Sequence, residues 1–354
     1  MASAHSRMRC GEFRTTYQKD MTIFPTPLAR RVAVIAVLLS LLAPSVLSPY
    51  LLNLGIQIGY YGIAALGLNI VVGFTGQISL GHAAFFGFGA FASAWLNNVT
   101  GLPVFFCIPL AGAMTLAVGL IVGIPAGRIK GLYLAIATLA SQYILQDFFS
   151  RAEWFTGGAY GAMANPFSLF GFSFNTDQRY WYVVLFYVVI MYLLGTNLLR
   201  TRDGRAFVAV RDHYLSAEIM GINLTKYRIL SFGISSFYAG VGGALFGHYL
   251  GFVSAEGFTI ILSIQFLGMI IIGGMGSVMG SLMGTAFMVL LPELMETGVI
   301  LVGSDSTALT QVLAYIKEMA ISLAIILFLI FEPDGLAHRW RMIKAYWKLY
   351  PFSY

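Results

Sequence analysis

One stretch decides the fold of this chain: Gly67-Leu-Asn-Ile-Val-Val-Gly-Phe-Thr-Gly-Gln-Ile-Ser-Leu-Gly-His-Ala-Ala-Phe-Phe-Gly-Phe-Gly-Ala-Phe91. Apolar runs flank a glycine-rich polar centre made of Thr75, Gln77, Ser79 and His82. Lipid offers no partners to exposed backbone groups, so a broken helix is tolerated there only where protein or a water-filled cavity surrounds it. The stretch therefore predicts part of a transport path through a membrane.

The composition supports a membrane setting. Of 354 residues, 58% are hydrophobic and only 10% are charged, too few polar groups to cover a soluble globule of this size. The two cysteines, Cys10 and Cys107, show no pair spacing, so neither a disulfide framework nor a metal site is indicated.

Apolar stretches of about 20 residues can each cross a bilayer as a helix, and the sequence contains about ten of them. The expected fold is therefore an all-α polytopic membrane protein. The predicted spans are 32–48, 51–72, 79–96, 103–124, 131–148, 180–199, 229–252, 258–275, 283–302 and 312–331. A re-entrant segment near 73–80 or 273–283 would change this count.

The basic residues give an orientation, because lysine and arginine gather in short cytoplasmic loops. With the N-terminus inside, nearly all of the 21 lysines and arginines fall on the cytoplasmic side, and only Arg151, Arg179 and Lys317 do not. Both termini are then cytoplasmic, as tails at 1–31 and 332–354 around a transmembrane region at 32–331. The net charge of +6 is thus an orientation signal rather than a sign of nucleic-acid binding.

The first apolar run lacks a small-residue cleavage pattern of the kind that ends a signal peptide, so we expect a retained first span. Met21 is an alternative start to Met1.

Two connections are long enough to do more than turn the chain. The outer one, 149–179, contains Trp154-Phe-Thr-Gly-Gly-Ala-Tyr-Gly161 and is predicted to face an extracytoplasmic partner. The inner one, 201–228, is predicted to hold one short helix that begins near Asp203 or Gly204 and ends at Gly221. Its apolar stripe comprises Ala206, Val210, Tyr214 and Ala217. Such a helix suits docking into a groove on another protein, the alternative being a helix that lies on anionic lipid headgroups.

Four separated motifs make the chain recognisable. They are the 67–91 stretch, the 204–221 loop with Ala217, Glu218 and Gly221, the run from Ser235 to Leu245, and Gly273-Gly-Met-Gly-Ser277. Together they resemble the permease subunits of branched-chain amino acid ABC importers, and more narrowly the second, M-type permease. The resemblance runs from about Leu51 to Leu336.

The resemblance implies the ABC importer permease fold in a bacterial inner membrane, with several partners. Two sister permeases would form the channel, two ATP-binding cassette subunits would dock on their cytoplasmic loops, and a periplasmic solute-binding protein would deliver a small-molecule substrate. Glu218 and Gly221, with Arg205 and Arg211 of the same loop, would contact the ATPase. The chain has no Gly-x-x-x-x-Gly-Lys-Ser/Thr loop and no cofactor of its own, so ATP would be used by a partner.

The chain departs from the family pattern at two places. Relatives that import leucine, isoleucine and valine show Thr-Gly-Gly-Ser-Asp-Gly where this chain has Ala159 and Tyr160, and the closing arginine is Glu332 here. The first change leaves the cargo open between branched-chain or other hydrophobic amino acids and urea, amides or small carboxylates.

Within the path, polar side chains would hydrogen-bond transiently to a zwitterion or an amide. The candidates are Asn69, Thr75, Gln77, Ser79 and His82. The alternative is that they satisfy the broken backbone near Gly73 and Gly76, since unpaired polar groups are costly in lipid.

Small residues at three- and four-residue spacing predict close helix contacts that would let sister subunits slide. Gly87, Gly243, Gly276 and Gly280 mark these lines. Static packing within one subunit is the alternative. Gly73-x-x-Gly76 is similar to Gly273-x-x-Gly276, which we interpret as coincidence, because the predicted topology gives both the same orientation.

Charged residues inside the predicted spans are paired or functional as a rule. Glu293 and Glu296 lie at a depth similar to that of Lys317, which predicts a structural ion pair. An ion-coupled secondary transporter, with these carboxylates as its ion site, is the rival hypothesis. No motif of a membrane-embedded enzyme appears in the sequence, so catalysis is not expected.

Overall fold

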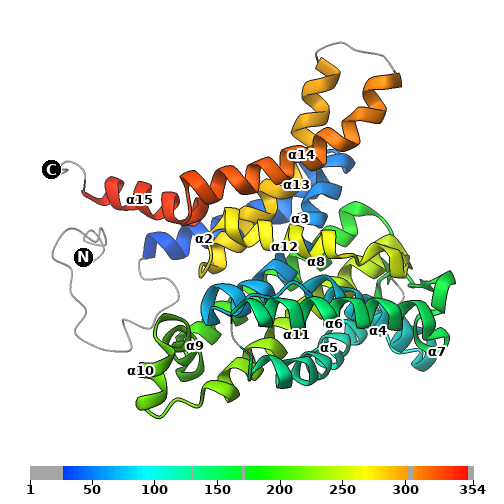
Figure 1. Cartoon of the computed structure of the whole chain (residues 1–354). Coiled ribbons are helices and arrows are strands. Elements are labelled where there is room, and N and C mark those ends of the chain that lie inside the picture. The colour runs from blue at the N-terminus through cyan, green and yellow to red at the C-terminus, as the bar shows by residue number, and fades with distance from the viewer. Residues whose placement is uncertain (1–26, 130, 170–171, 302–306, 350–354) are drawn as a thin grey trace, which may run out of the picture.

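The computed structural model describes residues 27–129, 131–169, 172–301 and 307–349. Long helices packed against one another make up most of this part of the chain (Figure 1). The long helices are α2 (Pro27–Val46), α3 (Pro49–Asn69), α4 (His82–Thr100), α5 (Val104–Ala126), α6 (Leu132–Arg151), α8 (Asp177–Arg200), α11 (Leu224–Leu250), α12 (Ile260–Gly273), α13 (Val278–Leu301), α14 (Thr307–Phe331) and α15 (Gly335–Leu349). The shorter ones are the π-helical turn η1 (Ile70–Phe74), α7 (Glu153–Thr156), η2 (Gly158–Tyr160), α9 (Arg202–Asp212), α10 (Tyr214–Ile219) and η3 (Ala255–Gly257).

The core forms where α3, α4 and α5 pack against α11. In α4 every residue from His82 to Ala94 is buried. In α11 small residues predominate among the buried positions, which allows neighbouring helices to approach closely. α3 also contacts α8, α12 and α13. The segment singled out by the sequence therefore occupies the centre of the bundle.

Several helix ends have recognisable caps. Ser48 accepts a hydrogen bond from the Leu51 amide at the start of α3, and Asn223 accepts one from the Lys226 amide at the start of α11. α11 ends at Gly251, whose φ of 74° is the left-handed conformation that glycine adopts readily at a C-terminus.

The outer connection predicted at 149–179 holds short ordered elements. β1 (Ala162–Met163) pairs antiparallel with β4 (Phe252–Val253), and β2 (Ser168–Leu169) pairs with β3 (Phe172–Ser173). Apart from these two pairs, the described elements are helical, which agrees with the expected all-α class.

The predicted count of about ten spans is not confirmed. Among the described residues, six helices are long and apolar enough to cross a membrane, or seven if the bent pair Tyr315–Phe331 and Gly335–Tyr346 is one span. The predicted spans at 32–48, 79–96 and 131–148 are helical, as α2, α4 and α6, but are not among the six. α4 and α6 carry several polar residues, and α4 is enclosed by protein, so it does not need the apolar surface of a lipid-facing helix.

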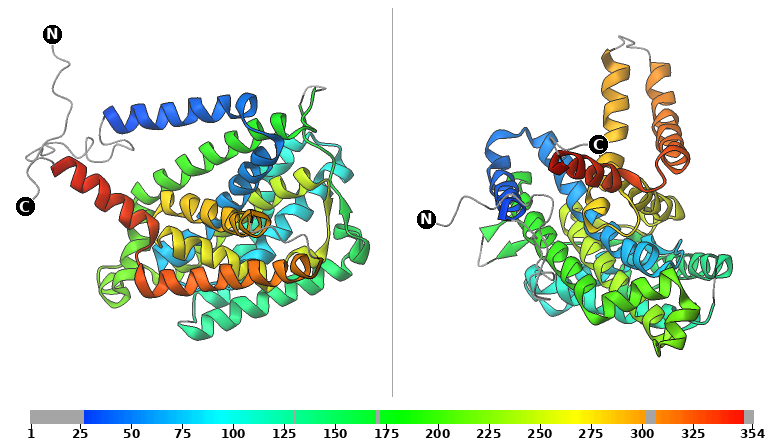
Figure 2. Two further views of the ribbon diagram at one scale, coloured as in Figure 1. Left: turned by 90° about the horizontal axis from the view of Figure 1, so that it is seen from above. Right: turned by 90° about the vertical axis from the view of Figure 1, so that its left-hand side faces the viewer.

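The two long connections lie at opposite ends of the bundle. Figure 1 shows α7 at one end, and α9 and α10 at the other. The hairpin of α13 and α14 projects from the bundle, as both Figure 1 and the right-hand view of Figure 2 show. Residues 1–26 of the predicted N-terminal tail lie outside the described residues, while part of the predicted C-terminal tail forms α15.

Candidate functional site

The central span is broken where the sequence predicts. α3 continues into the π-helical turn η1, residues 76–81 are not helical, and α4 starts at His82. Gly76 has φ of 68°, and the Gln77 amide donates to the Val71 carbonyl rather than to the residue four positions back. Burial then alternates, because Gln77 and Ser79 are buried while Ile78 is 44% exposed. All five predicted polar residues of this region are buried: Asn69, Thr75, Gln77, Ser79 and His82.

Asn69 ties the end of α3 to the start of α13. Its Oδ1 accepts from the Gly276 amide at 2.8 Å, and its Nδ2 donates to the Ser277 carbonyl at 2.9 Å and to Ser281 Oγ at 2.8 Å. Both ends of the amide are therefore used within the protein. The two glycine pairs that the sequence analysis treats as a coincidence meet here, because a Cβ on Gly73 would lie 2.4 Å from the Gly276 nitrogen.

Gln77 belongs to a second polar cluster, which ties the broken segment to the first turns of α11. Its Nε2 donates to Thr75 Oγ1 at 3.0 Å and to Ser231 Oγ at 2.9 Å. The two hydroxyls donate onward to carbonyls, Thr75 to Val71 at 2.6 Å and Ser231 to Arg228 at 2.8 Å. Each hydroxyl has one proton, so Gln77 must present its NH₂ group to them, which fixes the amide orientation.

This orientation leaves Gln77 Oε1 without a partner. It is the buried side-chain oxygen or nitrogen that lacks a hydrogen bond among the described residues. Buried polar atoms are nearly always paired, so an unpaired acceptor in a broken helix indicates a group that receives a donor from elsewhere.

The start of α4 is held by residues that the sequence analysis did not single out. Gln142 of α6 accepts from the Ala84 amide at 2.8 Å, and Ser263 of α12 accepts from the Ala83 amide at 2.9 Å. The first amides of a helix have no partner within it, and these side chains supply one. Gln142 could have been found as a polar residue inside a predicted apolar span.

His82 contacts the neighbouring α3. Its Nε2 lies 2.8 Å from the Ala64 carbonyl, and because a carbonyl only accepts, this nitrogen is the donor. The ring thus joins α4 to α3 just above the break.

The inner connection differs from the prediction of a single helix. α9 and α10 are separated at His213, whose φ of −155° and ψ of 84° are not helical. Of the predicted apolar stripe, Ala206, Val210 and Ala217 are buried, but Tyr214 is 39% exposed. Gly221 ends the segment with φ of 83°, as expected.

The tip of this segment is exposed. Glu218, Gly221 and Arg205 are all exposed, and Arg205 Nη1 donates to the Arg200 carbonyl. Beside Glu218, the apolar side chains Ile219 and Met220 are 85% and 81% exposed.

Unlike Arg205, Glu218 and Gly221, Arg211 contacts the broken span. Its Nη1 donates to the Gly73 carbonyl in η1 at 2.7 Å, and its Nε and Nη2 contact Asp212 Oδ1 at 2.8 Å. It therefore brings the inner connection into direct contact with the broken span.

The predicted packing glycines contact other parts of the same chain. A Cβ on Gly243 of α11 would lie 1.8 Å from the Phe86 carbonyl of α4, and one on Gly87 would lie 2.5 Å from the Phe258 ring. A Cβ on Gly280 would lie 2.6 Å from the Gly273 carbonyl, and one on Gly276 would lie 3.0 Å from Arg211 Nη1.

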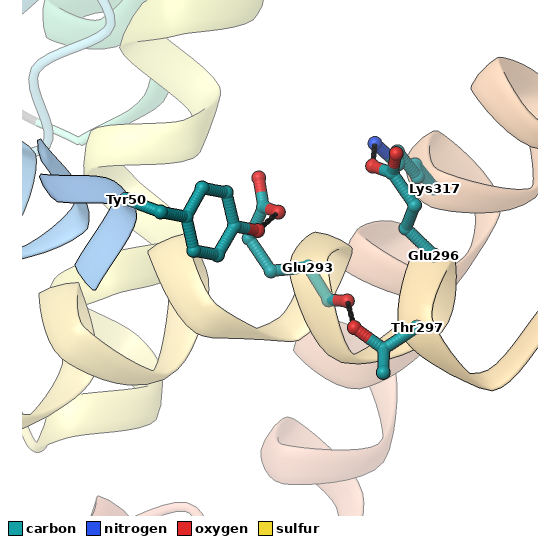
Figure 3. A network of polar contacts seen from close by, with 5 residues as sticks. All are labelled: Tyr50, Glu293, Glu296, Thr297 and Lys317. Carbon is teal, nitrogen blue, oxygen red and sulfur yellow. Dashed lines mark hydrogen bonds and ion pairs between the residues drawn. The ribbon is translucent and has the colours of Figure 1, made fainter. Parts of the chain in front are cut away.

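The predicted ion pair of the membrane region is confirmed. Lys317 of α14 contacts Glu296 of α13, with 2.5 Å between Nζ and Oε2 (Figure 3). Glu293 is engaged differently, because its carboxylate accepts a hydrogen bond from the hydroxyl of Tyr50 on α3. Glu296 thus links the two helices of the projecting hairpin, and Glu293 links the hairpin to α3 of the bundle.

Comparison with known proteins bears on this arrangement. A family model described as the permease component of branched-chain amino acid transport systems matches residues 50–330. The chain is 33% identical over 288 residues to the high-affinity branched-chain amino acid transport system permease protein LivM of Salmonella typhimurium, covering 73% of this chain and 68% of the relative. The chain is 34% identical over 260 residues to LivM of Escherichia coli, covering 67% of this chain and 61% of that relative.

The permease protein LivH of Salmonella typhimurium is 23% identical over 306 residues, covering 80% of this chain and 94% of that protein. The chain thus spans about two thirds of the length of the two LivM proteins. No solved structure matches it.

Proposed function

Because the chain belongs to the permease family of branched-chain amino acid transport systems, we propose that it is one of two sister permeases in an ATP-driven importer of branched-chain amino acids. The family consists of transport permeases, so the chain is not an enzyme. In this proposal it crosses the bacterial inner membrane about ten times, with both termini in the cytoplasm. A LivH-like chain is the sister, two ATP-binding cassette subunits drive the cycle, and a periplasmic binding protein delivers the cargo.

One observation supports docking of the ATPase on the inner connection. Ile219 and Met220 are almost fully exposed beside Glu218, on a segment at one end of the bundle (Figure 1). Two adjacent exposed apolar side chains with a charged rim are typical of a protein interaction site. Beneath them Val210 and Ala217 form a buried cluster with Leu224 at the start of α11, so a partner that binds the tip also holds α9 and α10.

The opposite end offers a surface for the binding protein. Trp154 and Tyr160 are 71% and 91% exposed there, and aromatic side chains are enriched in protein interfaces. Thr156 beneath them is buried and donates to the Phe149 carbonyl at 2.6 Å, which fixes the loop that carries both aromatics.

The cargo path runs past the broken span in this proposal. Gln77 is the side chain best suited to contact it, because its unpaired Oε1 can accept a hydrogen bond from an ammonium group. Asn69, the Thr75 hydroxyl and Nε2 of His82 are hydrogen-bonded within the protein, so these residues would define the shape of the path rather than bind the cargo.

The test is uptake in proteoliposomes that contain this chain, the sister permease, both ATPases and the binding protein. We expect leucine uptake that requires ATP, stops with vanadate and survives collapse of the proton gradient. Competition by leucine, isoleucine and valine, but not by urea, amides or short carboxylates, would identify the cargo. Uptake by this chain alone, driven by an ion gradient, would contradict the proposal.

A further inference from the structure

Arg211 connects the inner segment to the ends of two spans. Resting on the proposed function, we propose that Arg211 is the positioning residue that transmits movement of α9 and α10, when the ATPase moves them, to the broken span. Glu218 and the exposed tip bind the partner in this arrangement, whereas Arg211, whose side chain is 37% exposed, contacts η1 and acts within the chain.

The contact with η1 is a charge-assisted hydrogen bond. Arg211 Nη1 lies 2.7 Å from the Gly73 carbonyl oxygen, while Asp212 Oδ1 holds Nε and Nη2 of the same guanidinium at 2.8 Å. The guanidinium is planar, so fixing two of its nitrogens also directs the third. Asp212 therefore orients Arg211 toward η1.

The Gly73 carbonyl is available because the helix ends there. In a continued α-helix the Gln77 amide would bond to Gly73, but it donates to Val71 instead at 3.0 Å. The last carbonyls of a helix also carry a partial negative charge, which favours a cation at this position. Arg211 thus supplies the C-terminal partner that the span lacks.

The same guanidinium lies against a second glycine-rich break, at 273–276, between α12 and α13. A Cβ on Gly276 would lie 3.0 Å from Arg211 Nη1, and one on Gly76 would lie 3.0 Å from Arg211 Cγ. Asn69 joins the two breaks directly, through its bond to the Gly276 amide. A shift of Arg211 therefore acts at once on the end of α3 and on the turn between α12 and α13.

The test uses the assembled complex in proteoliposomes, with leucine uptake and ATP hydrolysis measured on the same preparation. The variants are Arg211→Gln, Arg211→Lys and the control Arg202→Gln, which removes the same charge from the exposed first turn of α9. In Arg211→Gln we expect binding-protein-stimulated ATP hydrolysis to continue while leucine moved per ATP falls about tenfold, as expected for loss of one hydrogen bond from a charged group. Arg211→Lys should recover part of the loss, because its ammonium can still donate to Gly73.

The outcomes separate this inference from the proposed function. If the wild-type complex shows no ATP-driven leucine uptake, the proposed function fails. If it does, and Arg211→Gln moves as much leucine per ATP as Arg202→Gln, the transmission role is wrong. Failure of both Arg211 variants to assemble would likewise overturn it, because the residue would then be needed for folding alone.

Discussion

At the scale of single residues, Gln77 and Gln142 form an instructive pair. Both are buried glutamines near the start of α4, but only Gln142 has both ends of its amide bonded, to the Ala84 amide and to the Phe258 carbonyl at 2.7 Å. Gln77 has one end bonded and one end open. Their substitutions should therefore have opposite consequences.

We predict that Gln142→Met lowers the stability by about 2–4 kcal/mol, because it leaves two buried backbone groups unpaired. Gln77→Met should cost less than about 1 kcal/mol. The hydroxyls of Thr75 and Ser231 still donate to the Val71 and Arg228 carbonyls, and the unpaired Oε1 of Gln77 is removed. If Gln77 Oε1 contacts the cargo, the same variant slows leucine uptake or changes substrate preference. Thermal unfolding in detergent and uptake in proteoliposomes measure the two effects. Wild-type uptake by an assembled Gln77→Met complex would remove Gln77 from the path.

The sequence was sufficient to find the polar residues at the break but not their partners. The glycines and polar side chains of 67–91 lie together in the sequence, so their interruption of an apolar run is visible locally. Ser231, Gln142 and Ser281 come from distant helices, and only the packing brings them to Gln77, Ala84 and Asn69. Which polar atom remains unpaired depends on that packing, so Gln77 could not be separated from Asn69 in advance.

At the scale of helices, α4 and α11 are held in contact by glycine. Gly243 has the Phe86 carbonyl so close that a Cβ would lie 1.8 Å from it. This neighbour is backbone, so it can move only if the whole helix moves. The approach of the two helices therefore depends on the missing side chain.

We predict that Gly243→Ala lowers the stability by about 1–3 kcal/mol, the usual cost of forcing a methyl group into a packed interior. Gly257→Ala is the control, because a Cβ there would meet nothing within 4 Å. Thermal unfolding of the two purified variants should differ clearly. Equal unfolding temperatures would mean that α4 and α11 separate without cost.

The exposed tip of α10 permits a sharp test of docking. Glu218→Lys and Ile219→Asp should weaken co-purification of the ATPases and uncouple hydrolysis from transport while the chain stays inserted. Met163→Asp, a change at a 70% exposed residue at the opposite end, is the control for co-purification of the ATPases. Deleting 205–221 should uncouple as well, but it also removes the buried Phe207 and Val210. Unchanged ATPase binding by both tip variants would place the docking site elsewhere.

The inner segment also shows a limit of prediction from sequence. Its apolar spacing and Gly221 correctly indicate a helical segment and its end. The break at His213 has no local signal, because neither glycine nor proline stands there. It follows directly after Arg211 and Asp212, and Arg211 contacts Gly73 of η1, a segment more than a hundred positions away in the sequence.

At the scale of the whole molecule, the charged residues of the α13–α14 hairpin allow a structural ion pair to be distinguished from an ion-coupling site. Lys317 and Glu296 are paired, with side chains 27% and 42% exposed in the isolated chain. Replacing one partner leaves a charge at membrane depth, whereas replacing both leaves none.

We predict that Lys317→Met costs about 2–3 kcal/mol of stability, the order of magnitude for an unpaired charge in a transmembrane helix. The double variant Lys317→Met, Glu296→Gln should regain most of that loss and transport leucine at a rate close to wild type. Thermal unfolding and uptake in the presence of a protonophore measure both. Loss of uptake in a stable double variant would revive the ion-coupled hypothesis.

The span count depends on how the helices pack as well as on how apolar they are. Hydropathy measures how apolar a helix is, and α4, whose residues from His82 to Ala94 are all buried in protein, can carry the polar His82 and Ser93. Whether α4 and α6 cross the membrane depends on neighbouring helices that are distant in the sequence, so the hydropathy of each segment alone cannot decide it.

The partnership of α3 with α11 has a consequence for biogenesis. These are the most enclosed of the six apolar helices, with 78% and 72% of their most apolar 18-residue stretches buried, yet α11 begins at Leu224, long after α3 has ended at Asn69. At about 5–20 residues per second, the ribosome needs on the order of 10 s to deliver the later helix. During that interval the buried face of the nascent α3 has to be sheltered by the insertion machinery. Ribosome-bound chains arrested before Leu224 should therefore cross-link to the insertase through α3, and chains arrested after Gly251 should not.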